Sequence, residues 1–246
     1  MPATPAWPPR SLPRLYVEQP LSAGVAVGLD AAQANYLGNV LRLQEGGEVL
    51  LFDGASGEWL ARVAESTKRR MVLGVVESTR AQEAVPDLTL AFAPIKKGRI
   101  EFLVEKAVEL GVARLEPVIT RRTIVDKVNL DRMRNHIVEA AEQCGRTALA
   151  TIAEPVKLEA WLKAVERDRT LYFADETGGT PAASAFAPGP ATILTGPEGG
   201  FTPDEAEAIR ALPNATAISL GPRILRAETA ALAAVTAYMA LAGDWR

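Results

Sequence analysis

Residues 194–230 read LTGPEGGFTPDEAEAIRALPNATAISLGPRILRAETA, and this stretch decides the fold. It holds two Gly-Pro turns, which begin at Gly196 and Gly221, and each follows a short apolar run. In α/β proteins, ligands bind in the crevice beyond the carboxyl ends of the strands, where loop backbone and helix N-termini line the site. The stretch therefore predicts two strand-to-loop junctions that build one ligand site.

The chain around this stretch alternates apolar runs with amphipathic segments. Buried strands are expected at LTLAFA, LEPVI, TLYFA, ATILT and AISL, and helices around 100–110, 130–144, 158–166, 203–212 and 227–241. Strands that are apolar along their whole length are typical of a parallel sheet covered on both faces. The sequence therefore predicts an α/β domain in this part of the chain.

A segment rich in Gly, Pro and Ala, residues 175–190, interrupts the alternation. It is too long for a simple turn, and such a structureless loop is either functional or a disordered surface insertion. Asp175 and Glu176 open it directly after an expected strand, where a carboxylate can accept a hydrogen bond from a ribose hydroxyl.

The first part of the chain has a different rhythm. The runs GEVLLFDG, EWLARVAE and RMVLGVVES are rich in Val and Leu and are separated by Gly or charged clusters, which indicates a small β-rich unit. Asp30 is a suitable N-cap for a helix through about Leu43. A polar segment, ESTRAQEAVPD, then marks the linker. We expect a β-rich domain over 1–78 and the α/β domain over 79–246.

Composition excludes several classes of protein. The chain has 246 residues, of which 48% are hydrophobic, so it can form a real core. A single cysteine, Cys144, and a single histidine, His136, argue against disulfides, a zinc site and Ser-His catalysis, and no metal is expected. The sequence has no run near the roughly 20 apolar residues of a membrane span and no apolar signal-peptide core. We expect a cytoplasmic protein that does not enter a membrane.

The first Gly-Pro turn leads into a well-specified helix start. Thr202 is a good N-cap, Pro203 suits the first helical position, and Glu205 completes a capping box. The glycines before it leave a loop whose backbone can approach a flat ligand closely, and a plain strand-to-helix turn rarely needs three of them. Glu198 is the one charge that this loop projects.

The second turn leads into the last helix. Ile224 and Leu225 are apolar and available to line a pocket, and Arg226 lies beside them. Glu228 falls in the first helical turn, where the helix dipole favours a carboxylate; it is either a site residue or only a helix-terminus charge. The helix itself is mostly Ala and Leu, so we expect it to be buried in the core or against another subunit.

Net charge does not decide whether the chain binds nucleic acid. The formal charge is −3, but Lys and Arg cluster locally after two expected strands and in the proline-rich arm before residue 18. Such clusters are either solvated faces or phosphate contacts, and their position at one edge of a parallel sheet favours phosphate. The candidates are Arg10, Arg14, Lys96, Lys97, Arg121 and Arg122. The G-x-G-x-x-G and P-loop motifs of ordinary nucleotide sites are both absent from the sequence.

Long motifs in a fixed order resemble the bacterial 16S rRNA uridine-N3 methyltransferase family, a branch of the SPOUT methyltransferases. The two long ones are LTGPEGGFTPDE and LGPRILRAETAAL. Upstream, PRLY, VLRL and LFDG resemble the family's PUA-like domain, and EKAVELGV and EAAEQCGR resemble its catalytic domain. The resemblance runs nearly end to end. The stretch TALATIAEP after Arg146 departs from the family, and so does the longer N-terminal arm.

The resemblance implies a SPOUT-type parallel sheet with a C-terminal trefoil knot, preceded by a PUA-like RNA-binding domain. It also implies S-adenosylmethionine as the methyl donor, a homodimer, and 16S rRNA in the 30S subunit as the partner. Catalytic roles fall on Arg226, Glu228 and Thr229. Cofactor-binding roles fall on Leu194, Thr195, Gly196, Glu198, Gly200, Leu220, Gly221, Ile224 and Leu225.

Two other functions fit the same residues. A sister SPOUT enzyme would methylate another RNA or a ribose 2′-OH. A non-catalytic RNA-binding assembly factor would keep the pocket and bind the cofactor without turnover.

Overall fold

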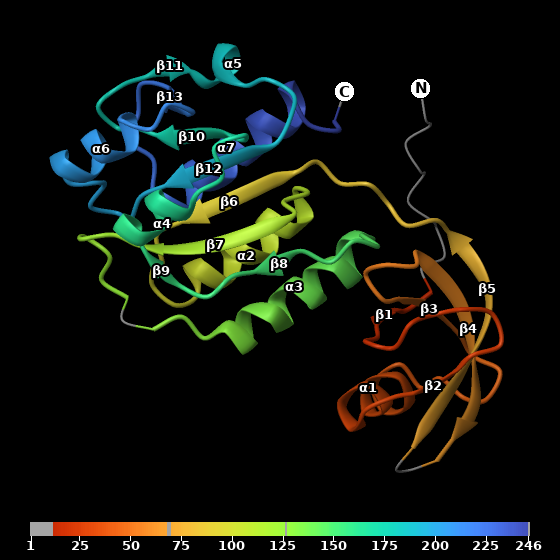
Figure 1. Ribbon diagram of the computed structural model, residues 1–246. Coiled ribbons are helices and arrows are strands. Elements are labelled where there is room, and N and C mark those ends of the chain that lie inside the picture. Colours follow the sequence, from red (N-terminus) through yellow and green to blue (C-terminus); the bar gives the residue numbers. More distant parts are fainter. Residues whose placement is uncertain (1–11, 68–69, 126, 246) are drawn as a thin grey trace. The chain divides into compact units, whose positions relative to one another are not determined.

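The structure is a computed structural model, and it describes residues 12–67, 70–125 and 127–245 (Figure 1). The chain divides into two compact units. The first comprises Met1–Glu83 together with Gly145–Ala148, and the second comprises Ala84–Cys144 and Leu149–Arg246. No helix in the described ranges is long and apolar enough to cross a membrane.

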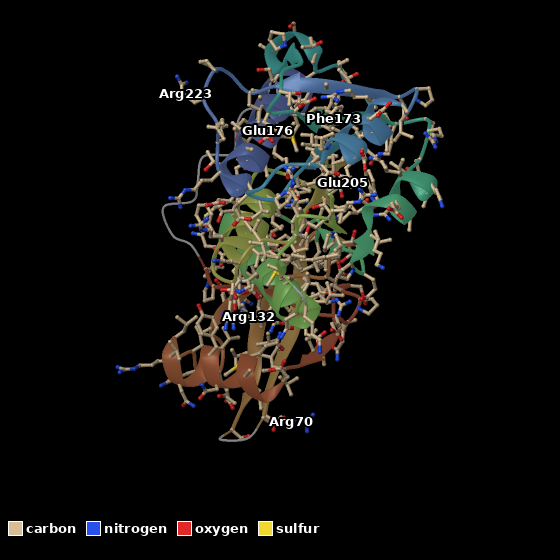
Figure 2. All side chains as sticks on the ribbon, turned by 90° about the vertical axis from the view of Figure 1, so that its left-hand side faces the viewer. Arg70, Arg132, Phe173, Glu176, Glu205 and Arg223 are labelled. Atoms are coloured by element: carbon tan, nitrogen blue, oxygen red, sulfur yellow. The ribbon has the colours of Figure 1, made fainter. Side chains whose placement is uncertain are left out.

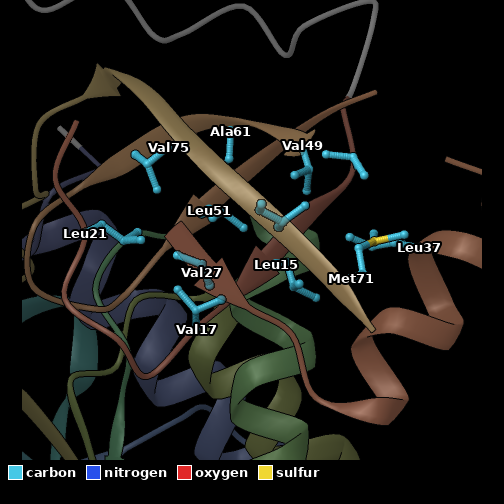
Figure 3. Close-up of a cluster of buried hydrophobic side chains, with 12 residues drawn as sticks. Leu15, Val17, Leu21, Val27, Leu37, Val49, Leu51, Ala61, Met71 and Val75 are labelled. Atoms are coloured by element: carbon cyan, nitrogen blue, oxygen red, sulfur yellow. The ribbon is translucent and has the colours of Figure 1, made fainter. Parts of the chain in front are cut away.

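The first unit is a five-stranded sheet. Its strands are β1 (Arg14–Tyr16), β2 (Ala26–Gly28), β3 (Glu48–Phe52), β4 (Glu58–Ser66) and β5 (Met71–Arg80), in the order β1-β3-β4-β5-β2. Only the β1–β3 pair is parallel among these neighbours. Alternate residues such as Val49 and Leu51 point into one apolar core with Val27 and Leu73 (Figure 3). The β-rich unit predicted from the sequence is confirmed.

The helix after Asp30 is shorter than predicted. Asp30 forms a capping box with Gln33, as its position suggests, but the α-helix α1 ends at Asn35 (Ala31–Asn35). A π-helical turn, η1 (Tyr36–Val40), replaces its continuation to Leu43. Leu37 is fully buried in the core of the unit, and Arg42 takes a positive φ of 57° that ends the helical path. The packing of Leu37 in the core therefore accounts for the difference between the predicted helix and the shorter α1.

The second unit is built on a parallel sheet. Its strands are β6 (Leu88–Phe92), β7 (Arg114–Ile119), β8 (Thr151–Ile152), β9 (Val156–Lys157), β10 (Thr170–Ala174), β11 (Thr180–Pro181), β12 (Ala191–Thr195) and β13 (Ala215–Ser219). The order is β11-β13-β10-β12-β6-β7-β8, with β9 beside β7. Every pairing between these strands is parallel. The five predicted strands are confirmed.

Helices cover both faces of this sheet. They are α2 (Arg99–Glu109), α3 (Leu130–Cys144), α4 (Leu158–Ala164), α5 (Ala182–Ala185), α6 (Pro203–Arg210) and α7 (Ala227–Leu241). Trp161 of α4 and Ile209 of α6 pack with Phe173 on one face. Tyr172 points to the other face and meets Tyr238 of α7, which packs against α2 (Figure 1). This two-sided cover explains why the strands are apolar throughout.

The segment 175–190 is not structureless. It contains the short strand β11, which pairs with β13, and the single-turn helix α5. Phe186 stacks edge-on against Tyr172 with ring centroids 4.8 Å apart, and it also contacts Tyr238. One half-buried aromatic among small residues and prolines is too weak a pattern to predict these contacts.

Candidate functional site

A cavity of about 780 Å³ opens at the carboxyl ends of β12, β10 and β13. These strands are neighbours in the sheet, so the loops that leave them meet at one edge. Its lining includes both Gly-Pro turns, the residues after β10, and the first turns of α6 and α7. The volume is in the range of small-molecule sites. The single ligand site predicted from the two turns is therefore present as a cavity.

The first turn contributes backbone and little side chain. Gly196 lies against Phe201, because a Cβ added at Gly196 would come within 3.2 Å of that ring. Gly200 has a φ of 67°, a backbone conformation that favours glycine. Thr195, Gly196, Glu198 and Gly200 all line the cavity, as predicted. Leu194 does not: its side chain is fully buried in the α4/α6 core, and its role in cofactor binding stays a prediction.

The helix that follows begins where the sequence predicts. Thr202 and Glu205 form the full capping box of α6. Glu205 is only 6% exposed, and its other carboxylate oxygen accepts a hydrogen bond from the backbone N–H of Arg121 at 2.7 Å. One buried carboxylate thus ties the loop after β7 to the loop after β12 and holds this wall of the cavity.

The second turn supplies the apolar part of the lining. Leu220, Gly221, Ile224 and Leu225 all line the cavity, and Gly221 has a φ of 107°. Ile224 is 88% exposed, which is unusual for a large apolar side chain and leaves it available to a ligand. Arg223 projects from the outer edge of this unit (Figure 2).

Two carboxylates follow β10, and they are placed differently. Asp175 is 5% exposed and forms an ion pair with Arg210, and it also accepts hydrogen bonds from the backbone N–H and the hydroxyl of Thr177. Burial alone would raise the pKa of Asp175, but these hydrogen bonds and the Arg210 charge outweigh it, so its pKa is lowered. Glu176 lines the cavity. Both residues line the cavity, but the carboxylate of Asp175 is used within the protein, whereas that of Glu176 has no partner among the described residues.

The predicted catalytic residues lie at the start of α7, beside the cavity. Arg226 is the exposed N-cap residue, and its side chain does not cap the helix. Thr229 is exposed, and Glu228 is partly buried, with a side chain 13% exposed. Their neighbours Leu225 and Ala227 line the cavity, whereas Arg226, Glu228 and Thr229 do not.

Arg99 joins two of the acidic residues, a link that sequence reasoning missed. Its guanidinium lies 3.7 Å from a carboxylate oxygen of Glu198 and 3.7 Å from one of Glu228. The other oxygen of Glu228 is buried without a hydrogen-bond partner among the described residues. The sequence does place Arg99 in a basic run after β6, but it does not indicate which carboxylates that run would meet.

The basic candidates divide into three groups. Lys96 and Lys97 are exposed after β6. Arg121 forms an ion pair with Asp204 at 2.8 Å, and Arg122 lines the cavity and donates to the Gly199 carbonyl at 2.6 Å. Arg10 lies outside the described residues.

Arg14 is internal to the first unit. It forms an ion pair with Glu58 at 2.8 Å, and each of these side chains is 11% exposed. Its guanidinium also lies over the Phe52 ring and donates to the carbonyl of Arg146. These contacts make Arg14 part of the internal structure of its own unit, and its contact with RNA stays a prediction.

Two family models match the chain. One describes an RNA methyltransferase domain and matches residues 82–239. The other describes an RNA methyltransferase PUA domain and matches residues 29–76. Together they account for both units.

Several known proteins are similar over nearly the whole chain. Ribosomal RNA small subunit methyltransferase E of Rickettsia conorii is 32% identical over 90% of this chain and 93% of its own length. The protein of the same name from a Synechocystis strain is 32% identical over 93% of this chain and 77% of its own length. Among solved structures, a ribosomal RNA small subunit methyltransferase E from Neisseria gonorrhoeae bound to S-adenosyl methionine has a TM-score of 0.88 at 29% identity and covers 96% of this chain and 100% of its own.

Proposed function

This chain belongs to the RNA methyltransferase family that includes ribosomal RNA small subunit methyltransferase E, and we propose that it methylates N3 of a uridine in 16S rRNA with S-adenosylmethionine. The observation that carries the proposal is the cavity itself. Two glycine-rich turns of the predicted motifs line it from β12 and β13, the strands on either side of β10, and the matching solved structure is bound to that cofactor. Calorimetry with S-adenosylmethionine tests the proposal, because a protein that does not bind this cofactor cannot use it as the methyl donor.

The cavity fits the cofactor through backbone groups. The turns at Gly196 and Gly221 bring the backbone to the cavity wall, where it can approach an adenine edge, while Ile224 and Leu225 supply apolar contact. Glu198 is an acidic residue on the wall, which suits a cationic ligand. We assign cofactor contacts to Thr195, Gly196, Glu198, Gly200, Leu220, Gly221, Ile224 and Leu225. When bound, the cofactor supplies a methyl group on a positively charged sulfur.

Residues at the start of α7 position the uracil base and stabilise its anion. The N3–H of uracil is a weak acid, so the protein must remove its proton or stabilise the anion that forms as N3 is methylated. Arg226 is exposed and not used for capping, so it is available to steer the base or its phosphate. Glu228 and Thr229 order the same helical turn, and Arg99 holds Glu228. Positioning of this kind supplies much of the acceleration in two-substrate reactions.

Exposed basic residues hold the RNA backbone. In the second unit these are Lys96, Lys97, Arg121 and Arg122, which follow β6 and β7, and Arg122 also lines the cavity. In the first unit we assign RNA binding to the PUA-like domain over residues 1–78, with Arg10 in its arm. On its surface, Tyr36 and Val40 are exposed on η1, and an exposed aromatic ring can stack on an unpaired base.

Residues 79–246 form the methyltransferase domain of this proposal. The trefoil knot stays a prediction from the resemblance, and so does the homodimer. Supporting the dimer, α2 and α7 pack together, and each leaves a large apolar side chain exposed: Phe102 at 47% and Leu241 at 42%. Because the substrate is part of the ribosome, we place the protein in the cytoplasm.

A further inference from the structure

Glu176 carries the uncommitted carboxylate at the β10 end of the cavity. It makes no ion pair and no hydrogen bond with any residue in the described ranges, although it lines the cavity. Its neighbour Asp175 has the opposite character, because Arg210 and Thr177 use its carboxylate fully. Of the two carboxylates that line the cavity after β10, Glu176 is therefore the one free to bind a ligand.

The fold places Glu176 between the two Gly-Pro turns. Strand β10 pairs with β12 on one side and with β13 on the other, so the residues after it stand between the loops that begin at Gly196 and Gly221. Gly200 makes room for the side chain: a Cβ added at Gly200 would collide with the Glu176 carboxylate. Figure 2 shows Glu176 within the same unit as the labelled Arg223 of the second turn. The backbone at Gly200 and the carboxylate of Glu176 thus lie in contact on one wall of the cavity.

We propose that Glu176 binds the ribose of S-adenosylmethionine by accepting hydrogen bonds from its 2′- and 3′-hydroxyls. This inference rests on the proposed function and adds to it the residue that recognises the sugar. An ionised carboxylate is an acceptor with two oxygens, and a vicinal diol presents two donors at matching spacing. An acidic residue that follows a parallel strand recognises ribose in the same way in dinucleotide-binding folds.

The position of Glu176 favours the ribose over the amino group of the cofactor. The basic residues that approach RNA follow β6 and β7, and β12 separates β6 from β10. The reacting methyl group must face that RNA side, where Glu198 and Arg99 lie. Glu176 lies on the other side of β12, next to the backbone turns that receive the nucleoside part of the cofactor.

Binding of analogues to the full chain tests the proposal. The ligands are S-adenosylhomocysteine, its 2′-deoxy and 3′-deoxy analogues, and 5′-methylthioadenosine, which keeps the ribose but lacks the amino acid. We expect the wild-type protein to bind each deoxy analogue about tenfold more weakly than S-adenosylhomocysteine, since a hydrogen bond to a charged group is lost. In Glu176→Ala that difference disappears, because the diol no longer has its acceptor. The same variant loses affinity for methylthioadenosine.

Two variants serve as controls. Glu207→Gln removes another charge from the cavity lining and keeps the deoxy penalty. Glu176→Gln keeps the shape and one acceptor oxygen and retains part of the penalty, which guards against a folding defect in the Ala variant. The proposal is overturned if the deoxy penalty persists in Glu176→Ala, or if that variant loses affinity for S-adenosylhomocysteine but not for methylthioadenosine. A wild-type protein that binds none of these ligands would instead overturn the proposed function itself.

Discussion

The Nε atom of Arg99 lies 3.7 Å from a carboxylate oxygen of Glu228, at the first turn of α7. The same guanidinium reaches Glu198 in the first Gly-Pro turn, so one side chain links the cavity wall to the start of α7, where Arg226 is the N-cap residue. Both contacts are longer than a direct hydrogen bond, and the Arg99 side chain is 41% exposed, so the two ion pairs contribute little to stability. We attribute to Arg99 a positioning role.

Replacing Arg99 should therefore affect turnover more than stability. For Arg99→Ala we expect kcat to fall about tenfold or more, which corresponds to about 1.4 kcal/mol of transition-state stabilisation. The midpoint of thermal unfolding should hardly change. Steady-state methyl transfer to 30S subunits and calorimetry with the cofactor measure the two effects.

Arg99→Lys is the matched variant, because it keeps the charge but loses the planar guanidinium that reaches two carboxylates. It should recover part of the lost kcat. A variant Arg99→Ala with normal kcat and a large loss of cofactor affinity would place Arg99 in cofactor binding instead of positioning.

Glu205 should prove a stability residue despite its place at the cavity wall. Glu205→Ala removes the Glu205 half of the capping box of α6 and leaves the part-buried N–H of Arg121 without its acceptor, so we expect a loss of about 2–3 kcal/mol in the free energy of unfolding. Denaturant titration measures it. Glu207→Ala, on the exposed side of the same helix, should change stability by no more than about 0.5 kcal/mol. Equal effects of the two changes would contradict this assignment.

The stability that Asp175 contributes should depend on pH. Because its folded-state pKa is lowered, the contribution is complete above the unfolded pKa of about 3.9 and is lost as the pH falls through the folded value. Asp175→Asn should therefore be less stable than the wild type at pH 7, by about 1–2 kcal/mol. The difference should shrink below about pH 4. Unfolding curves of both proteins from pH 3 to 7 check this, and a constant difference would contradict it.

Gly221 should be needed for its backbone conformation. A Cβ at this position would meet no atom within 4 Å, but the φ of 107° is strained for any other residue. We expect Gly221→Val to weaken binding of S-adenosylmethionine at least about tenfold by displacing the turn. Calorimetry decides it. Unaltered affinity would mean that the second turn does not form the cofactor site.

Much of this fold is predictable because local signals agree with the packing. Helix α3 has the predicted bounds 130–144, and the Thr202 capping box starts α6 where the sequence indicates. Failures occur where tertiary contacts decide. Leu37, which is buried in the core, lies in the π-helical turn that follows α1. Phe186 packs against Tyr172 and orders a segment whose sequence is typical of a loop.

Residue types in the site were easier to predict than their partners. Arg14 is a suitable RNA-binding residue by position, yet a buried pair with Glu58 uses it internally. Leu194 belongs to the right motif, but strand alternation turns its side chain to the core. Neither Arg99 between two carboxylates nor the contrast between Asp175 and Glu176 has a signal in the linear sequence, because each depends on which strands are neighbours.

The most direct test of the central claim is a methyl-transfer assay on 30S subunits from cells that lack this protein. The purified protein and labelled S-adenosylmethionine are supplied, and nucleosides from the digested 16S rRNA are identified by mass spectrometry. We predict one new N3-methyluridine per subunit, and a strong loss of product with Arg226→Ala. A 2′-O-methylated nucleoside, methylation of another RNA alone, cofactor binding without any product, or full activity of Arg226→Ala would contradict the account.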